Sequence, residues 1–299
     1  MKNIRLQRHL FTAMLSLVFI FMAALSTQTE AAQSYDNCTG FIDSLPATIT
    51  TQGTWCLRAD LTTAITSGNA ITIANNNVTI DCNDFKLGGL AAGLATQANG
   101  IYLFDRVNAT VRHCNIRGFL GGIYFDSTSA TSSGGHLVED NRFDGNTAFG
   151  LYVAGNGSLI QRNRVNATGG STIFGVAYGI YAVYSVDVID NTVTGVVPAV
   201  MFANANSLGI YTLLNVNGSI TGNRVRGLVK NGLAATFSIF NSASDRITLR
   251  NNDVVGDGSP NSVGLSCSSA NGRALNNVVS GFVTGINTCN NTSGNDVVP

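Results

Sequence analysis

Short runs of alternating apolar and polar residues fill the chain after its first thirty or so positions, without the apolar spacing of an amphipathic helix. One such run begins with Gly, then Ile or Leu, then Tyr, as at Gly179-Ile180-Tyr181. Because successive side chains of a strand point to opposite faces, this triplet buries the aliphatic residue and turns the tyrosine outward. The pattern predicts a chain built almost entirely of short β-strands.

The Gly-[Ile/Leu]-Tyr triplet recurs at intervals, and weaker copies follow it toward the C-terminus. Full copies begin at Gly100, Gly122, Gly150, Gly179 and Gly209, and weaker ones at Gly232, Gly264 and Gly285. Successive copies are 21 to 32 residues apart. A repeat of this length that holds three short strands is typical of one coil of a parallel β-helix, and the leucine ladder of a leucine-rich repeat is missing.

A second motif, Asn-x-apolar-x-Gly, keeps step with the first. Full copies begin at Asn141, Asn191, Asn223, Asn252 and Asn277, and degenerate copies lie at Asn83, Cys114 and Asn163. An Asn at the same turn of each coil can donate and accept hydrogen bonds along the axis, which satisfies the buried turn backbone. Glycine supplies the unusual backbone angles where the strands change direction. The two motifs predict an all-β parallel β-helix of about eight or nine coils.

These motifs, with an opening coil from Cys56 to Gly89, make the sequence similar to the right-handed parallel β-helix superfamily of pectate-lyase-like and NosD-like exported bacterial proteins. The resemblance implies a right-handed β-helix domain over residues 56–299, and we expect residues 32–55 to form an N-terminal cap. It implies little about activity, because the superfamily holds lyases, hydrolases, epimerases and non-catalytic proteins.

The outward tyrosines of the triplets are expected to form one column, with one ring per coil. They are Tyr102, Tyr124, Tyr152, Tyr181 and Tyr211. In pectate-lyase-like proteins this sheet forms the floor of a polysaccharide-binding groove, so the resemblance implies substrate binding along the tyrosine column. Long connections before three of the Tyr strands, at residues 90–99, 168–178 and 196–208, would border such a groove. Stacked rings also stabilise neighbouring strands without a ligand, and both explanations are open.

Catalytic groups are sparse on that face. A calcium-dependent lyase, as the resemblance suggests, needs several carboxylates beside a basic residue, and the nearest set is Asp105, Arg106 and Asp126. Surface ion pairing is the simpler explanation for these three. The sequence contains no Asp-Asp pair and no Gly-His-Gly motif, so it does not show the residues expected of a polygalacturonase-like hydrolase. We expect no metal or cofactor, except calcium if the protein is a lyase. Whether it is an enzyme, a polysaccharide-binding protein or a non-catalytic structural or adhesion rod is open.

Basic residues directly follow the motif asparagine in three coils, at Arg142, Arg164 and Arg224. They form either a cationic stripe for acidic sugars or a solvated face with cross-coil ion pairs. His113 and His136 are expected to be ordinary surface or turn histidines. Nothing in the chain resembles a phosphate loop, a zinc signature or a nucleic-acid-binding surface.

The first 31 residues resemble an export signal. Lys2, Arg5 and Arg8 precede an apolar run at 10–25, and small residues follow it. This is the pattern of a cleavable signal peptide, and the run is shorter than the roughly 20 residues of a membrane-spanning helix. After cleavage the chain would carry 14 basic and 16 acidic residues, and this nearly even charge does not indicate binding to polyanions. We expect a secreted or periplasmic protein that has no membrane or nucleic-acid partner after cleavage.

All six cysteines follow the predicted cleavage site, which fits an oxidising compartment. Three pairings are economical: Cys38 with Cys56, Cys82 with Cys114, and Cys267 with Cys289. The last pair has the best support, because both residues closely follow a Gly-Leu or Gly-Ile dipeptide and lie one repeat apart. The other two rest on proximity in the sequence, and free buried thiols are the alternative.

Overall fold

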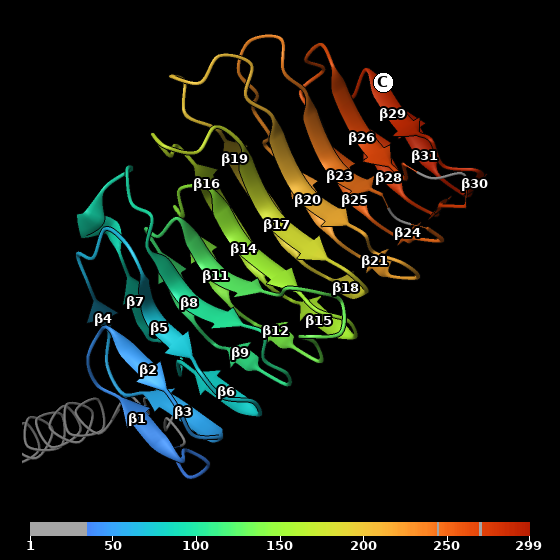
Figure 1. Ribbon diagram of the computed structural model, residues 1–299. Helices are drawn as coiled ribbons and strands as arrows, with labels where there is room; N and C mark the ends of the chain where they lie inside the picture. The colour runs from blue at the N-terminus through green and yellow to red at the C-terminus, as the bar shows by residue number, and fades with distance from the viewer. Residues whose placement is uncertain (1–34, 244, 269–270) are drawn as a thin grey trace, which may run out of the picture. The chain divides into compact units, whose positions relative to one another are not determined.

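The chain from Asn37 to Pro299 winds through three parallel β-sheets, and each coil adds one short strand to each sheet (Figure 1). The computed structural model describes residues 35–243, 245–268 and 271–299. The predicted signal peptide, residues 1–31, therefore lies outside the described residues. Within them, none of the helices is long and apolar enough to span a membrane.

Sheet B carries the tyrosine triplets predicted from the sequence. Its strands, in spatial order, are β2 (Ala47–Ile49), β5 (Asn69–Ile73), β8 (Asn99–Phe104), β11 (Gly121–Asp126), β14 (Phe149–Ala154), β17 (Ala177–Val183), β20 (Ser207–Leu213), β23 (Thr236–Ser242), β26 (Ser262–Ser266) and β29 (Thr284–Asn287).

Sheet A holds the apolar run that precedes each motif asparagine. Its strands are β1 (Gly40–Ile42), β3 (Gly53–Leu57), β6 (Val78–Asp81), β9 (Thr110–Arg112), β12 (Leu137–Glu139), β15 (Ser158–Gln161), β18 (Val186–Ile189), β21 (Ser219–Thr221), β24 (Thr248–Arg250), β27 (Arg273–Leu275) and β30 (Asn291–Ser293).

Sheet C holds the residues that follow each asparagine. Its strands are β4 (Leu61–Thr62), β7 (Lys86–Gly88), β10 (Asn115–Arg117), β13 (Arg142–Asp144), β16 (Arg164–Gly169), β19 (Thr192–Val197), β22 (Arg224–Arg226), β25 (Asp253–Val255), β28 (Val278–Ser280) and β31 (Asp296–Val298). The described residues contain one helix, the single 3-10 turn η1 (Leu90–Ala92), between sheets C and B.

The chain visits the sheets in the order B, A, C in each of the nine coils from β5 to β31. The predicted all-β parallel β-helix, with its assignment of three strands per coil, is confirmed. Residues 32–55, predicted as a cap, supply β1, β2 and the start of β3, and β1 pairs with β3 in sheet A. Their role as a cap stays a prediction.

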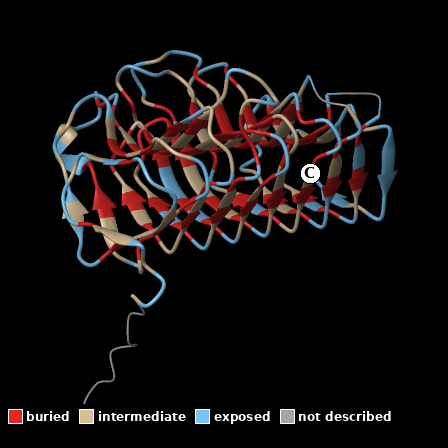
Figure 2. Cartoon of the chain, turned by 60° about the horizontal axis from the view of Figure 1, so that its bottom comes forward, coloured by how far each residue is buried: buried red, intermediate tan, exposed pale blue. Residues whose placement is uncertain are grey.

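Inward side chains of the three sheets fill the space inside the coils. Buried residues, red in Figure 2, lie on strands along the length of the coil stack. In sheet B the aliphatic residue of each of the five full triplets is fully buried, as at Ile101, Ile123 and Leu151. The weaker copy predicted at Gly232 was wrong, because Leu233 is exposed outside β23 and Ile239 holds the equivalent position in that strand. Sheets A and C face it with similar columns, represented by Val138 and Phe143. Burying one such side chain stabilises the fold by about 1.5–3 kcal/mol, so the stacked columns supply the main driving force.

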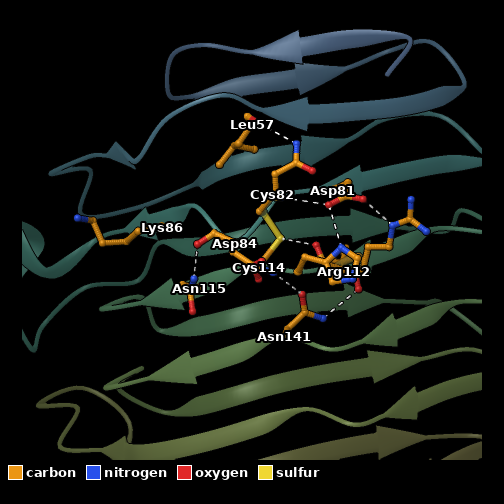
Figure 3. The surroundings of a disulfide bond; sticks show 12 residues. Leu57, Asp81, Cys82, Asp84, Lys86, Arg112, Cys114, Asn115 and Asn141 are labelled. Carbon is orange, nitrogen blue, oxygen red and sulfur yellow. Dashed lines mark hydrogen bonds and ion pairs between the residues drawn. A yellow bond between two sulfur atoms is a disulfide. The ribbon is translucent and has the colours of Figure 1, made fainter. Parts of the chain in front are cut away.

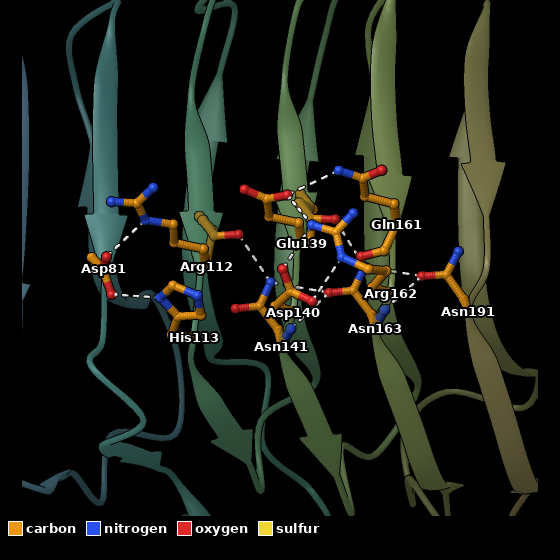
Figure 4. A network of polar contacts seen from close by, with 12 residues as sticks. Asp81, Arg112, His113, Glu139, Asp140, Asn141, Gln161, Arg162, Asn163 and Asn191 are labelled. Carbon is orange, nitrogen blue, oxygen red and sulfur yellow. Dashed lines mark hydrogen bonds and ion pairs between the residues drawn. The ribbon is translucent and has the colours of Figure 1, made fainter. Parts of the chain in front are cut away.

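A ladder of buried asparagines occupies the corner between sheets A and C (Figure 4). Asn191 is a typical rung: its Nδ2 donates to Asn223 Oδ1 and to the Ile160 carbonyl, both at 3.0 Å. Its Oδ1 accepts the backbone N–H of Asn163 at 2.9 Å. The rungs of the ladder are Asn141, Asn163, Asn191, Asn223, Asn252, Asn277 and Asn295. The predicted ladder is confirmed, and Asn295 is a rung that the motif did not reveal.

One residue turns the chain from sheet A to sheet C in each of these coils, directly before the ladder position. This residue has a positive φ even where it is not glycine, for example 54° at Asp140 and 53° at Arg162. A single left-handed residue makes the sharp corner, and the asparagine that follows it is thereby directed into the ladder.

The two sets of motif glycines serve different needs. Gly145 and Gly195 of the Asn motif have φ values of 62° and 70°, as the sequence predicted. Gly179 of a triplet lies outside the left-handed region, and a Cβ there would collide with the Gly209 carbonyl and with Val193 Cγ1. The expectation of unusual backbone angles was wrong for this position, where glycine is required because the next coil and the core approach too closely for a side chain.

All three predicted disulfides are present, and none of the described cysteines is free. Cys82–Cys114 lies at the foot of the asparagine ladder, where the Cys114 N–H donates to Asn141 Oδ1 at 3.0 Å (Figure 3). A covalent bond therefore joins two coils at the point where the amide rungs end.

Substitution Asn191→Ala is expected to lower the free energy of unfolding by about 3–4 kcal/mol, because the Ile160 carbonyl and the Asn163 N–H both lose a buried partner. Denaturant titration followed by circular dichroism measures the loss. Asn166→Ala is the control, since that exposed amide donates only to Asp144 and should cost less than about 0.5 kcal/mol. Equal losses in the two variants would refute a stabilising ladder.

Candidate functional site

The five predicted tyrosines lie at matching positions of adjacent strands on the outer face of sheet B. Successive ring centroids are 6.3 Å apart for Tyr102–Tyr124, 4.5 Å for Tyr124–Tyr152, 4.8 Å for Tyr152–Tyr181 and 4.7 Å for Tyr181–Tyr211. Phe240 extends the column, 5.6 Å from Tyr211. All these rings are partly exposed, so one edge of an unbroken aromatic column faces solvent.

A second aromatic row flanks the column and was missed from the sequence. Phe149 and Tyr178 stack at 5.4 Å, and Tyr178 packs against Tyr181 at 5.0 Å. Further along, Phe237 contacts Phe240 at 4.6 Å. Phe149 and Tyr178 stand directly before a triplet glycine, which was the available signal, whereas Phe237 precedes Ser238 and no predicted triplet marked it. The aromatic face, defined as the five tyrosines with Phe149, Tyr178, Phe237 and Phe240, is therefore two rings wide over part of its length.

The phenols of Tyr152, Tyr178 and Tyr181 stay protonated at neutral pH. Burial raises the pKa of Tyr178 to about 12, and burial also raises the pKa values of Tyr152 and Tyr181. The Asp126 carboxylate adds to this shift at Tyr152. Neutral phenols can donate hydrogen bonds and stack on a ligand, but they are poor bases and nucleophiles.

Long connections from sheet C to sheet B touch one another along one edge of the aromatic face. The Thr172 N–H donates to the Leu94 carbonyl at 3.1 Å, and Asn231 Nδ2 donates to the Ala199 carbonyl at 2.6 Å. Asn261 Nδ2 continues the series by donating to the Leu233 carbonyl at 3.0 Å. Connections that are far apart in the sequence are thus linked into a border beside sheet B. Its exposed side chains are largely apolar: Leu90, Leu94, Ile173, Phe174, Val200, Met201 and Leu233.

The predicted catalytic candidates lie beside the opposite ends of the tyrosine strands, and the surrounding loop engages each of them. Asp105 accepts hydrogen bonds from the N–H and Oγ1 of Thr128, at 2.8 and 2.9 Å. Arg106 Nε donates to the Ala74 carbonyl at 3.0 Å, and Asp126 accepts the Ser127 N–H. Among the described residues no three His, Cys, Asp or Glu side chains are grouped to hold a metal ion. A catalytic role for Asp105, Arg106 and Asp126 stays a prediction.

A buried histidine, His136, and a buried serine, Ser133, form a hydrogen bond beside this loop. The histidine is the donor in this bond, so it does not activate the serine as a nucleophile. The Ala109 N–H donates to His136 Nδ1 at 3.2 Å, so the proton of the neutral ring is on Nε2. Nε2 then donates to Ser133 Oγ at 2.7 Å, and that hydroxyl donates to the Arg106 carbonyl. Because the histidine donates to the serine, it cannot act as the base that would activate it. His136 was wrongly expected at a surface or turn.

Cross-coil ion pairs line the turn beside the asparagine ladder (Figure 4). Asp81 contacts Arg112 Nε at 2.7 Å and His113 Nδ1 at 3.1 Å. Arg162 contacts Asp140 at 2.8 Å and also reaches Glu139, and its hydrogen bond lowers the pKa of the Asp140 carboxyl. These pairs involve Arg112 and Arg162, whereas the basic row predicted from the sequence is Arg142, Arg164 and Arg224, so both alternatives for that row stay predictions.

Comparison with known proteins agrees with this geometry. A family model described as "Right handed beta helix region" matches residues 47–195. This chain is a right-handed parallel β-helix protein. A search of curated protein sequences found no match.

Several solved structures are similar to this β-helix protein at low sequence identity. The Dettilon tailspike protein is 15% identical over 83% of this chain, with a TM-score of 0.43, and this chain spans 60% of the tailspike chain. An alginate lyase from Paenibacillus sp. is 15% identical, with 88% of this chain and 100% of that chain covered and a TM-score of 0.41. The catalytic domain of an alpha-1,3-glucanase in complex with nigerose is 12% identical, with coverages of 88% and 62% and a TM-score of 0.38.

Acid is expected to destabilise the β-helix through His136. Burial lowers the pKa of His136 from 6.5 to about 4, so the unfolded chain binds an extra proton between these values. The free energy of unfolding should be highest above pH 6.5 and fall by about 3 kcal/mol as the pH drops to 4. Denaturant titrations at several pH values test this. His136→Gln should remove the loss in that window and His113→Gln should keep it, whereas unchanged behaviour of His136→Gln would contradict the assignment.

Proposed function

We propose that this β-helix protein binds a polysaccharide along the aromatic face of sheet B. The observation that carries the proposal is the unbroken, partly exposed column of rings from Tyr102 to Phe240, with centroid spacings of 4.5 to 6.3 Å. Sugar rings present apolar C–H faces that pack on aromatic rings, and a linear polymer suits a linear column. Tyrosine also offers a polar hydroxyl beside its apolar ring, which fits a ligand with alternating C–H and O–H groups.

The border of the face supports the same proposal. Asp126 lies on the same strand as Tyr124, two residues further on, and so faces the same side of sheet B. Its carboxylate can accept hydrogen bonds from sugar hydroxyls. The linked connections on the other edge supply apolar side chains such as Phe174 and Met201, which would limit the lateral movement of a bound chain.

Binding without cleavage is the form of this function that the residues support. The phenols of Tyr178 and Tyr181 are neutral, and in the described part of the chain no three His, Cys, Asp or Glu side chains are grouped to hold a metal ion. Three disulfides and the export-like residues 1–31 support action outside the cytoplasm, in the periplasm or after secretion.

The second candidate function is a structural or adhesion rod, in which the rings only stack on one another. It is favoured by the direct contact of every tyrosine of the column with a ring of the next coil. Such cross-strand pairs stabilise neighbouring strands by about 0.2–1 kcal/mol each, which is reason enough to repeat them.

Substitutions at Tyr152 and Tyr181 separate the two candidates. Binding of the purified protein to a panel of neutral and acidic polysaccharides is measured by affinity electrophoresis and calorimetry. Tyr152→Ala and Tyr181→Ala should each weaken binding about tenfold, the factor that corresponds to about 1.4 kcal/mol of lost contact. Tyr152→Phe and Tyr181→Phe keep the ring and should retain most of the affinity.

A parallel assay follows the release of unsaturated products and of new reducing ends, with and without calcium. Polysaccharide binding that is absent throughout the panel, or indifferent to both alanine substitutions, would leave the structural rod as the function. Release of unsaturated products or of new reducing ends would show that the protein cleaves the polysaccharide instead of only binding it.

A further inference from the structure

The outer face of sheet C concentrates basic side chains, although the chain as a whole does not. On each sheet C strand the central apolar residue points inward, so its two neighbours face solvent. Basic residues occupy these outward positions at Lys86, Arg117, Arg142, Arg164, Arg224 and Arg226. The corresponding acidic residues are Asp144, Asp253 and Asp296.

Ion pairs compensate these charges at both ends of the face and leave the middle, from Arg117 to Arg164, largely uncompensated. At the first end Lys86 Nζ contacts Asp60 at 2.9 Å. Arg224 and Arg226 share Asp253, at 3.0 and 3.2 Å. Arg142 reaches Asp144 only at 3.7 Å. Among the described residues Arg164 has no ion pair or hydrogen bond through its side chain, and the buried Nε of Arg117 has no hydrogen-bond partner.

Arg142 and Arg164 are placed where they repel each other. They are direct partners in the register of β13 and β16, so their backbones lie one strand spacing apart, about 4.8 Å. Like charges at directly opposite positions destabilise a sheet. The pair therefore costs stability, and an anion bound between the two guanidinium groups would remove that cost.

The surface around these arginines is hollowed in two places. One depression of about 470 Å³ is lined by Arg142, Arg164, Asn115 and Thr192, by the carboxylates of Asp84 and Asp190, and by the ion pair of Asp140 with Arg162. A second, also of about 470 Å³, is lined by Lys86, Arg117 and Thr62, where Gly88 leaves the space between Thr62 and Arg117 unfilled. Asn115 of the first depression pairs in register with Lys86 of the second, so the two are neighbours on one face.

We propose that the outer face of sheet C from β7 to β16 binds an acidic polysaccharide, with Arg142 and Arg164 holding carboxylates of successive sugars. Guanidinium groups bind carboxylates through paired, charge-assisted hydrogen bonds. A polyuronate carries one carboxylate per sugar, which matches a row of cations that repeats with the coils. This site goes beyond the proposed function, because it lies on a different sheet from the aromatic face.

The polar groups beside the arginines favour a sugar acid over a phosphate polymer. Asp84 and Asp190 can accept hydrogen bonds from the free hydroxyls of a uronate, and Asn115 and Thr192 can exchange them in both directions. Nucleic acid carries a denser charge and few free hydroxyls, so the same two carboxylates would repel it.

The test uses the full chain with polygalacturonate as the probe, and the same polymer with methyl-esterified carboxylates as the uncharged match. Wild-type protein should bind polygalacturonate with an affinity that falls as salt is raised, and bind the ester at least about tenfold more weakly. Arg142→Gln and Arg164→Gln should each weaken binding of the acid about tenfold, as expected for one lost charge-assisted contact.

Two controls separate binding at this site from binding elsewhere on the protein and from a loss of stability. The double variant Arg250→Gln/Arg273→Gln removes two exposed sheet A charges and should bind polygalacturonate like wild type. Thermal unfolding of Arg164→Gln should occur at or above the wild-type midpoint, since the variant relieves repulsion. Equal weakening by the sheet A double variant, absence of polygalacturonate binding, or equally tight binding of single-stranded DNA would each overturn the proposal.

Discussion

Every other feature of this protein depends on the stacking of one coil on the next at a fixed spacing. A single coil has three strands of three to seven residues, too few to bury its own apolar side chains or to satisfy its own backbone. The neighbouring coil provides both, because it presents the same residue types at the same places. The asparagine ladder is the clearest case: the side chain of Asn191 has its partners in the coils on either side, and one of its bonds returns to its own coil at Ile189.

The same stacking turns any repeated outward residue into a column, with consequences that depend on its chemistry. Neutral aromatic rings attract one another, so the tyrosines of sheet B are stable without a ligand. Charged residues of one sign repel, so the adjacent Arg142 and Arg164 of sheet C are not explained by stability. Where opposite charges alternate, as with Asp140 and Arg162 at the turn, the column stabilises itself. A column of like charges destabilises the protein without a ligand, whereas a column of aromatic rings stabilises it. The like-charge column is therefore the stronger indication of a bound ligand.

Much of the fold could be predicted from the sequence, because in a solenoid a motif that recurs once per coil stacks on its own copies in one direction. The triplets located sheet B and its tyrosine column in this way. Prediction was weaker where a feature depends on the approach of the next coil, as at Gly179, or on a loop without a counterpart in other coils, such as the one that encloses His136. Phe149 and Tyr178 precede a triplet glycine, yet Leu208 holds that position in the next coil, so this part of the aromatic face has no strict period.

The asparagine ladder also gives the coil stack an electrical direction. From Asn141 to Asn277 each Nδ2 donates one hydrogen to the Oδ1 of the following rung, and each Oδ1 accepts from the preceding coil. The other Nδ2 hydrogen donates back to a carbonyl of the preceding coil, as at Ile160 and Ala274. The side-chain amide dipoles therefore point the same way, and hydrogen bonds in such a chain polarise and strengthen one another. The two ends of the ladder differ in polarity, with the carbonyl end toward Cys114 and the amino end toward Asn295.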